Sequence, residues 1–377
     1  MKFIEVEETE FKDFSEKSEA TNFLQSLEMY HRYLDRGNEA YLVGVKDGKN
    51  LKAVALLVTK TKVLNKKVFI SPRGFLADFK AKDFEEVLKT FTDGAKKFLK
   101  NKNGGLLEIS PKISRVAKVD DDGVPTENMR RSKETKLFEK YGYKNLGEYE
   151  FIKWAYVLPT KDLTEETLMK HFRKGHREAI RFSTSRYGIR LKELKTSELK
   201  ILKSLTDDSA RRHGFITPDI KYYEEMKKAY GKKVRFLVAE APKTVIDAFK
   251  NGESLEQIKK AALEAKETDE FIPVAGAMFV IWKNEIIYLF SGQAEDYRKL
   301  GGPHFLQFIM IKEAIKQKIP EYNFYGTDPK KKDGVYEFKR GYHGELREYI
   351  GTFMLPLSIV GRLFLLKQKY EDVRDIH

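Results

Sequence analysis

The sequence runs through one order of elements twice, and this duplication limits the folds that are open to the chain. Each half has two strand-like stretches, then a helix-like stretch, then a last strand-like stretch: 40–60, 66–79, 84–103 and 104–111 in the first half, and 234–241, 272–297, 300–319 and 321–326 in the second. A duplicated α+β unit explains this order, with chance recurrence of a common strand–helix order as the alternative.

The two halves also end alike. In "FEKYGYK", Phe138 is followed by a Gly–Tyr pair, and in "FKRGYHG", Phe338 is followed by another, with one residue of spacing different. We therefore expect domain 1 over residues 1–155 and domain 2 over 156–377. Residues 242–270 interrupt the second half between two strands. They are polar, helix-prone and broken by an Asn–Gly pair, which predicts a short helical arm inserted in domain 2.

The composition limits which kinds of site and partner are open to the chain. The 377 residues include no cysteine, which excludes disulfides, thiolate catalysis and cysteine-ligated metals. The net charge of +14 attracts polyanions such as nucleic acid, anionic lipid or phosphorylated substrates, although it also serves solubility alone. No signal peptide and no apolar run of about 18 residues is recognisable, so we expect a cytoplasmic protein. The amphipathic C-terminal helix is expected to dock on its own domain, with membrane contact as the alternative.

A turn before the long helix of the second half resembles a known anion-binding loop. In "YRKLGGPHF", residues 297–305, Arg298, Gly301 and Pro303 nearly match the R-x-x-G-x-G/A loop of the GNAT acetyltransferases, whose backbone N–H groups hold a pyrophosphate. Pro303 has no N–H, so the loop is expected to hold coenzyme A poorly. A plain helix start with proline in its first turn is the alternative.

The stretch "YNFYGTDPKKKDGVYEFKRGYHG", residues 322–344, predicts a buried strand, a basic loop and a short helix. The chain has no metal-ligand, serine-elbow or phosphate-loop motif, and its histidines are scattered, so we expect no metal. A transferase without a nucleophile depends on orientation and electrostatics, which suffice for an activated ester or thioester. Lys339 follows the strand-end loop and is a candidate to stabilise an oxyanion or grip a phosphate. A plain surface cation is the alternative.

This C-terminal stretch resembles the signature of the FemABX family of aminoacyl-tRNA-dependent peptidyl transferases. Further segments match in register: 23–45, 71–79, 172–191, 212–223 and 286–308. The resemblance implies an α+β fold of two tandem GNAT-like domains with a short helical arm in the second. It implies transfer of an amino acid from charged tRNA to the stem-peptide amine of a peptidoglycan precursor, which builds the interpeptide bridge.

The resemblance also implies site residues. Lys339 and Phe338 are the expected catalytic pair, with Lys339 near the oxyanion or the tRNA 3′ end and Phe338 shaping the site. The expected substrate-binding residues are Arg32, Arg36, Arg73, Arg212, Tyr222, Tyr288, Tyr325, Gly326 and Tyr336. Relatives often carry a lysine where this chain has Tyr33, so Arg32, Arg36 and Arg212 are expected to hold the precursor's phosphates instead.

The implied partners are aminoacyl-tRNA, as co-substrate, and a precursor that is either lipid II or a UDP-linked muropeptide. No cofactor is expected, and peripheral contact with the inner face of the membrane is compatible with the charge. An immunity variant with the same chemistry is equally compatible. Two other classes stay open: a coenzyme A-dependent N-acyltransferase, and a non-catalytic protein that binds RNA or a membrane surface.

Overall fold

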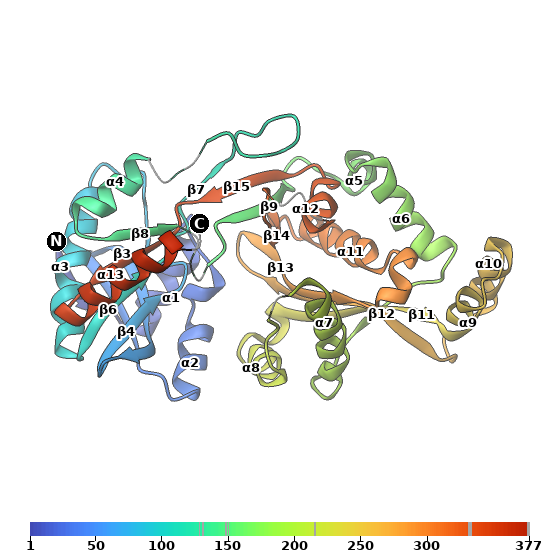
Figure 1. Cartoon of the computed structure of the whole chain (residues 1–377), viewed down its shortest axis with the longest axis horizontal. Helices are drawn as coiled ribbons and strands as arrows, with labels where there is room; N and C mark the ends of the chain where they lie inside the picture. Colours follow the sequence, from blue (N-terminus) through green and yellow to red (C-terminus); the bar gives the residue numbers. More distant parts are fainter. Residues whose placement is uncertain are drawn as a thin grey trace. The chain divides into compact units, whose positions relative to one another are not determined.

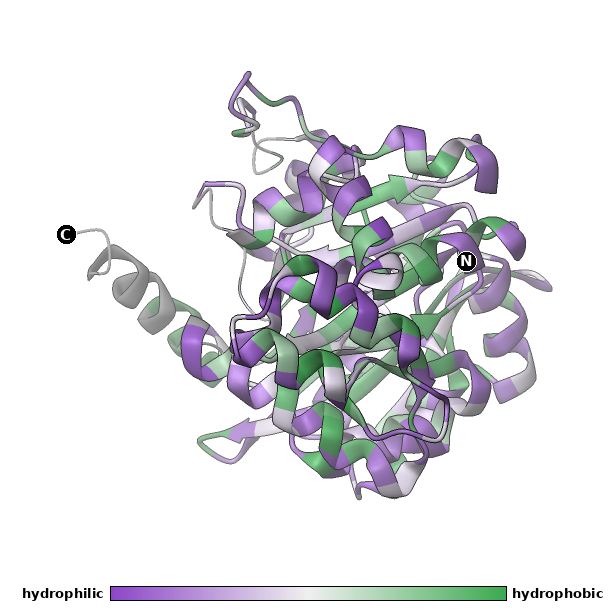
Figure 2. Ribbon diagram, turned by 90° about the vertical axis from the view of Figure 1, so that its right-hand side faces the viewer, coloured by the Kyte–Doolittle hydropathy of each residue, from purple (hydrophilic) through white to green (hydrophobic). Residues whose placement is uncertain are grey.

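The computed structural model describes residues 1–127, 129, 132–147, 149, 151–214, 216–330 and 334–374. The chain forms two compact units: unit 1 comprises Met1–Ala155 and Leu346–His377, and unit 2 comprises Tyr156–Glu345. Figure 1 shows their helices and strands along the chain. The helices carry both hydrophilic and hydrophobic residues along their length, as amphipathic helices do (Figure 2). None of the helices in the described residues combines the length and apolar content needed to cross a bilayer.

Unit 1 is built on a mixed sheet. Its strands lie in the order β1 (Lys2–Glu5), β2 (Ala40–Asp47), β3 (Asn50–Val63), β4 (Lys66–Ser71), β6 (Gly104–Ile109), β16 (Thr352–Pro356) and β8 (Lys144–Gly147), and β5 (Leu76–Ala77) pairs with β3. The β4–β6 pair is parallel, and α3 (Phe84–Asn101) makes the crossover that a parallel pair requires. Phe84, Val87, Leu88 and Phe91 of α3 recur at helical spacing, and all four are buried in the core.

Unit 1 also contains elements outside this sheet. They are α1 (Glu8–Lys17), a 3₁₀ turn (Phe23–Gln25), α2 (Leu27–Asp35), β7 (Ser114–Val116), α4 (Lys133–Lys140) and α13 (Ile359–Arg374). The side chain of Gln25 is fully buried and ties the turn before α2 to the sheet. Its Nε2 donates to the Pro72 carbonyl (2.7 Å), and its Oε1 accepts from the Leu56 backbone N–H (2.8 Å).

Unit 2 repeats this plan. Its strands follow the order β10 (Arg190–Glu193), β11 (Val234–Pro242), β12 (Phe271–Ile281), β13 (Glu285–Gln293), β14 (Glu321–Gly326) and β9 (Trp154–Pro159). The β13–β14 pair is parallel, and α11 (Gly302–Lys316) makes its crossover. The other helices are α5 (Glu165–His171), α6 (Lys174–Ser185), α7 (Leu199–His213), α8 (Ile220–Tyr230) and α12 (Gly334–Arg340), with 3₁₀ turns at Thr196–Glu198, Gly231–Lys233 and Glu295–Leu300.

The similar ends of the two halves have the same packing. Phe138 and Tyr143 make an edge-to-face contact with ring centroids 5.6 Å apart at 81°. Phe338 and Tyr342 make the equivalent contact at 5.5 Å and 78°. The duplication expected from the order of elements is therefore present in three dimensions, down to a pair of aromatic rings in each half.

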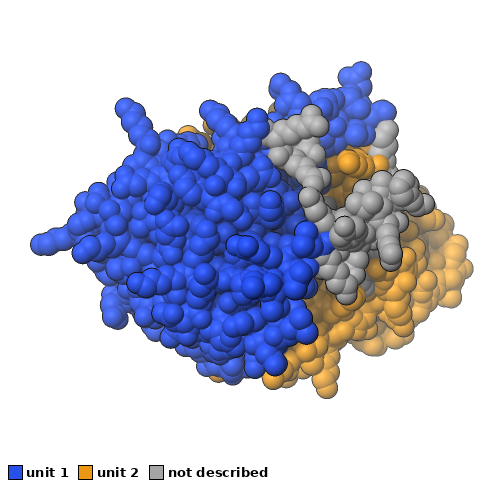
Figure 3. Space-filling view, turned by 60° about the vertical axis from the view of Figure 1, so that its left-hand side comes forward, with its two compact units in different colours: residues 1–155, 346–377 blue, residues 156–345 orange. Residues whose placement is uncertain are grey.

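The domain limits agree with expectation at one boundary and differ at the other. The change from unit 1 to unit 2 falls between Ala155 and Tyr156, where domain 1 was expected to end. Residues 346–377, however, belong to unit 1 and not to a second domain of 156–377 (Figure 3). The reason is that β16 pairs antiparallel with both β6 and β8, so Phe353 lies opposite Ile109 on one side and Asn145 on the other.

The inserted arm has the expected form. Between β11 and β12 lie two short helices, α9 (Lys243–Lys250) and α10 (Leu255–Glu264). Val245, Ile246 and Ile258 are buried, so the two helices have a small apolar contact that the polar composition of 242–270 concealed. Ser254 begins α10 with a capping box to Gln257.

Candidate active site

The parallel strands of unit 2 share only a short ladder. β13 and β14 pair over three residue pairs, from Glu285–Glu321 to Ile287–Asn323, although both strands continue beyond them. A β-bulge in β13, where the register shifts between Tyr288 and Phe290, accompanies this change. Because a bulge bends its strand, the end of β14 is released from its neighbour at this point.

A buried polar pair fixes the end of β14. Asn323 donates from Nδ2 to Oε2 of Glu285 (2.7 Å), and both residues are buried. Its Oδ1 accepts from the backbone N–H of Tyr325 (2.8 Å), and Tyr325 has a left-handed φ of +62°. Few non-glycine residues adopt this conformation, so the turn is held by its surroundings. Gly326 follows, with its carbonyl oxygen facing α12.

Lys339 lies at this strand end. It is 5% exposed, and its Nζ donates to the Gly326 carbonyl. Tyr336, three residues earlier on the same helical face, is also buried and contacts Tyr156 edge-to-face, with centroids 6.3 Å apart. A buried ammonium group is poorly solvated, which strengthens its electrostatic effect on any charge that develops beside it. The arrangement can therefore stabilise an oxyanion at the end of β14.

Helix α6 holds α12 in place. His176 donates from Nε2 to the Phe338 carbonyl (2.8 Å), and the Arg173 backbone N–H donates to the Gly341 carbonyl (2.8 Å). Gly341 has no room for a side chain, because a Cβ there would lie 1.9 Å from the His176 ring. On the outer side, Arg340 is 2.7 Å from Glu337 and holds the pKa of that carboxyl below its usual range.

A cluster of polar aromatic side chains lies beneath these elements. The His304 ring packs edge-to-face against His176 and Phe338, with ring centroids 4.8 Å and 4.9 Å away. The Tyr322 hydroxyl donates a hydrogen bond of 2.5 Å to Oε1 of Gln307. Within the described residues, His304 Nδ1, Gln307 Nε2 and the Tyr342 hydroxyl are buried without a hydrogen-bond partner. Burial, with a smaller contribution from His176, lowers the pKa of His304 to about 3.

This pKa predicts acid lability. His304 has a pKa of about 3 in the folded chain and an ordinary value of 6.5 when unfolded, so the unfolded chain binds more protons between these values. The contribution of His304 to the free energy of unfolding is therefore fully present above pH 6.5 and falls as the pH decreases towards 3. Its slope from this residue is at most about 1.4 kcal/mol per pH unit. Chemical denaturation at pH 7 and pH 5 measures it.

The variant His304→Phe, which cannot bind a proton, is expected to flatten this pH dependence. An equal slope in wild type and His304→Phe would show that other groups cause the acid lability.

The expected site residues fall into separate groups. Lys339, Phe338, Tyr325, Gly326 and Tyr336 come together at the end of β14, although Phe338 packs against His176, His304 and Tyr342. Arg212 lies on α7, where its NH2 donates to the Gln293 carbonyl (3.0 Å) and its Nε lies 2.9 Å from Glu295.

Tyr222 of α8 contacts Phe290 edge-to-face with centroids 5.7 Å apart, near the end of β13. Burial raises the pKa of Tyr288 to about 12, and the neighbouring Ser291 and Gln307 side chains lower it in part. Tyr288 thus connects to the polar cluster beneath α12, whereas Arg212 and Tyr222 lie on the side of the sheet formed by α7 and α8. Their role in substrate binding stays a prediction.

The three arginines expected in the first half belong to unit 1. Arg32 is 7% exposed within α2, and Arg36 is exposed at the end of that helix. Arg73 is buried, its guanidinium lies 4.2 Å from the Tyr349 ring centroid, and its NH2 donates to the Ile152 carbonyl (2.8 Å). These contacts give Arg73 a structural role, so of the three only Arg36 presents an exposed cation. Substrate binding by all three stays a prediction.

Helix α6 packs against the turn that resembles the GNAT anion loop. Gly301 has a left-handed φ of +76°, and a Cβ there would lie 2.9 Å from the carbonyl oxygen of Ala179 in α6. Helix α6 therefore packs directly on the N-terminus of α11, where a pyrophosphate would bind. This packing, together with Pro303 in the first turn, disfavours the coenzyme A alternative.

Sequence reasoning missed His176, His304, Gln307 and the Asn323–Glu285 pair. The histidines were weighed only as metal ligands. The one available signal was Gly341 in "FKRGYHG", since a glycine is also used where another group approaches the backbone closely.

Comparisons with known proteins show which family the chain matches. The model of the FemAB family matches residues 6–246 and 243–361. The aminoacyltransferase FemA of two Staphylococcus aureus strains, RF122 and MRSA252, is 26% identical over 407 residues, covering 95% of this chain and 96% of the relative.

Solved structures give the same fold. The crystal structure of FemX has a TM-score of 0.75 at 20% identity and covers 97% of this chain and 99% of its own. A tandem GNAT protein from the clavulanic acid biosynthesis pathway has a TM-score of 0.50 at 8% identity, covering 85% and 84%. The predicted α+β fold of two tandem GNAT-like domains is confirmed.

Proposed function

Because this chain belongs to the FemAB family and is a transferase, we propose that it moves an amino acid from aminoacyl-tRNA to the stem-peptide amine of a peptidoglycan precursor. The product is a lengthened side branch, which builds the interpeptide bridge. Lipid II is the preferred acceptor, and a UDP-linked muropeptide is the soluble alternative.

The observation that carries the proposal is the buried Lys339 at the end of β14. In the reaction, the lone pair of the precursor amine attacks the ester carbonyl, and the carbonyl oxygen becomes an oxyanion. The C–O bond to the tRNA ribose then breaks, an amide forms, and the amine proton leaves as the ribose hydroxyl is restored. The ester is already activated and the nucleophile belongs to the substrate, so the protein needs only to orient both and to stabilise the oxyanion.

The other residues have supporting roles in this proposal. Tyr325 and Gly326 form the strand end against which the ester is placed, and Tyr336 fixes the buried face of α12. Phe338 anchors α12 on His176 and His304, a refinement of its expected role in shaping the site. The net charge of +14 suits two phosphate-bearing substrates. No cofactor is required, because aminoacyl-tRNA itself supplies the activated group.

Reconstitution tests the proposal. The purified chain is incubated with a mixture of charged tRNAs and an acceptor, which is lipid II in one arm and the UDP-linked precursor in the other. The masses of the muropeptides are then measured by mass spectrometry. A mass gain of one amino-acid residue is expected in at least one of the two arms. Acetyl-CoA in place of charged tRNA is the matched control and is expected to give no acetylated product. Product from acetyl-CoA alone, or no mass gain in any arm, would contradict the proposal.

A further inference from the structure

The turn between β3 and β4 in unit 1 exposes an apolar side chain at a position where a polar residue is expected. Val63 and Lys66 are paired in register, so Leu64 and Asn65 form a two-residue hairpin loop. Both have left-handed φ values, +44° and +63°. This turn type favours Asn or Gly at both positions. Leu64 is 79% exposed in this conformation. A leucine here is unfavourable twice, because its backbone is left-handed and its apolar side chain faces water.

Helix α13 lies beside this hairpin and also exposes apolar side chains. It packs on unit 1 through Gly361, Phe364 and Leu365, in a cluster that includes Val63 of β3. On its other face, Ile359, Leu363 and Leu366 recur at spacings of four and three residues and are 75%, 57% and 55% exposed. The turn and the helix are thus neighbouring elements that both expose apolar side chains, which we together call the tip surface: Leu64, Ile359, Leu363 and Leu366.

Basic side chains border the tip surface. Lys62 and Arg362 are exposed, and in the described part of the chain neither has an ion pair. Lys66, whose Nζ donates to Asn103 Oδ1 (2.7 Å), lies by Gly105 and Ser358 at the start of α13. Exposed leucines flanked by Lys and Arg are the composition of segments that lie at a bilayer interface, with apolar groups below the headgroups and cations among them.

We propose that the tip surface docks unit 1 on an anionic lipid bilayer. The charge complementarity of Lys62, Lys66 and Arg362 with acidic headgroups selects this occupant over a second copy of the chain. The proposal does not depend on the transfer reaction, because the vesicles that test it contain no precursor. It explains why a strained turn keeps a leucine.

Co-sedimentation of the full chain with vesicles tests it. Wild type is expected to bind vesicles of phosphatidylcholine with phosphatidylglycerol at least about tenfold more than phosphatidylcholine alone, and less as salt is raised. Leu363→Glu is expected to lower this binding about tenfold or more. Leu263→Glu, at a leucine of α10 that is 75% exposed, is the matched control and should bind like wild type.

Leu64→Asn separates the proposed role from a structural one. Asn tolerates left-handed φ, so this variant is expected to keep or raise the melting temperature while it loses vesicle binding several-fold. Unchanged vesicle binding in Leu64→Asn and Leu363→Glu would overturn the proposal. So would analytical ultracentrifugation that shows a dimer converted to monomer by Leu363→Glu without any effect of lipid, since the tip surface would then be an interface between copies.

Discussion

Replacement of Lys339 by methionine is expected to lower the rate of aminoacyl transfer by at least about 100-fold, because a donor to a developing oxyanion contributes that much or more in a site of this kind. Methionine is unbranched like lysine and only one atom shorter, but it has no charge and no N–H group. Binding of charged tRNA should stay near the wild-type level, since it draws on many cations. Single-turnover transfer and a tRNA filter-binding assay measure the two effects separately.

Two controls make this result specific. Lys312→Met, on α11, removes a lysine that pairs with Glu165 (2.7 Å) and should leave the transfer rate unchanged. The melting temperature of Lys339→Met should fall by no more than a few degrees, because the lost hydrogen bond from the charged lysine to Gly326 contributes about 1.5–3 kcal/mol. Full transfer activity in a folded Lys339→Met protein would remove Lys339 from its role, while leaving the family's reaction itself intact.

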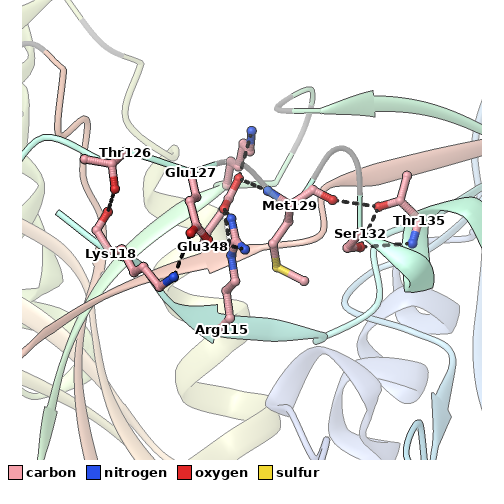
Figure 4. A network of polar contacts seen from close by, with 9 residues as sticks. Arg115, Lys118, Thr126, Glu127, Met129, Ser132, Thr135 and Glu348 are labelled. Carbon is pink, nitrogen blue, oxygen red and sulfur yellow. Dashed lines mark hydrogen bonds and ion pairs between the residues drawn. The ribbon is translucent and has the colours of Figure 1, made fainter.

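Glu348→Ala is expected to lower the stability of unit 1 by about 3–5 kcal/mol, since it leaves two cations with no buried counter-charge. Glu348 is fully buried in β15 (Glu345–Tyr349). Its Oε2 accepts from Arg115 NH2 (3.0 Å), and its Oε1 accepts from the Met129 backbone N–H (2.8 Å) and lies 3.3 Å from Lys153 Nζ. Figure 4 shows Arg115 and Met129 converging on this carboxylate from different segments.

The neighbouring Glu127 provides the control. It contacts Arg115 (3.2 Å) and Lys118 (2.7 Å) at the surface, where its side chain is 44% exposed. Glu127→Ala should therefore change stability by less than about 1 kcal/mol. Guanidinium denaturation followed by circular dichroism compares the two variants. Equal, small losses would mean that the buried network around Glu348 contributes little net stability.

The order of elements in each half was predictable because strand and helix periodicities are local. Buried positions in α3 recur every three or four residues, and the arm between β11 and β12 is marked by its polar composition. The short helix carrying Phe338 and Lys339 was also expected. The resemblance to a family then placed these residues in a site that local patterns alone would have assigned to the surface.

Residues whose partners are distant in the sequence could not be found in this way. Glu348 meets Arg115 across 233 residues, and the charged run "ELRE" does not indicate which side chain turns inward. His176 meets the Phe338 carbonyl across 162 residues. The position of β16 in unit 1 depends likewise on pairing with β6 and β8, which no local pattern encodes.

The insertion of β16 between β6 and β8 has a consequence for how the protein is made. A ribosome delivers strands in order, so β6 and β8 leave the exit tunnel long before residues 352–356, which must lie between them. Unit 1 therefore cannot complete its sheet while unit 2 is being synthesised. Because its last strand pair is the most distant in sequence, the N-terminal half of the molecule is the last to reach its final form.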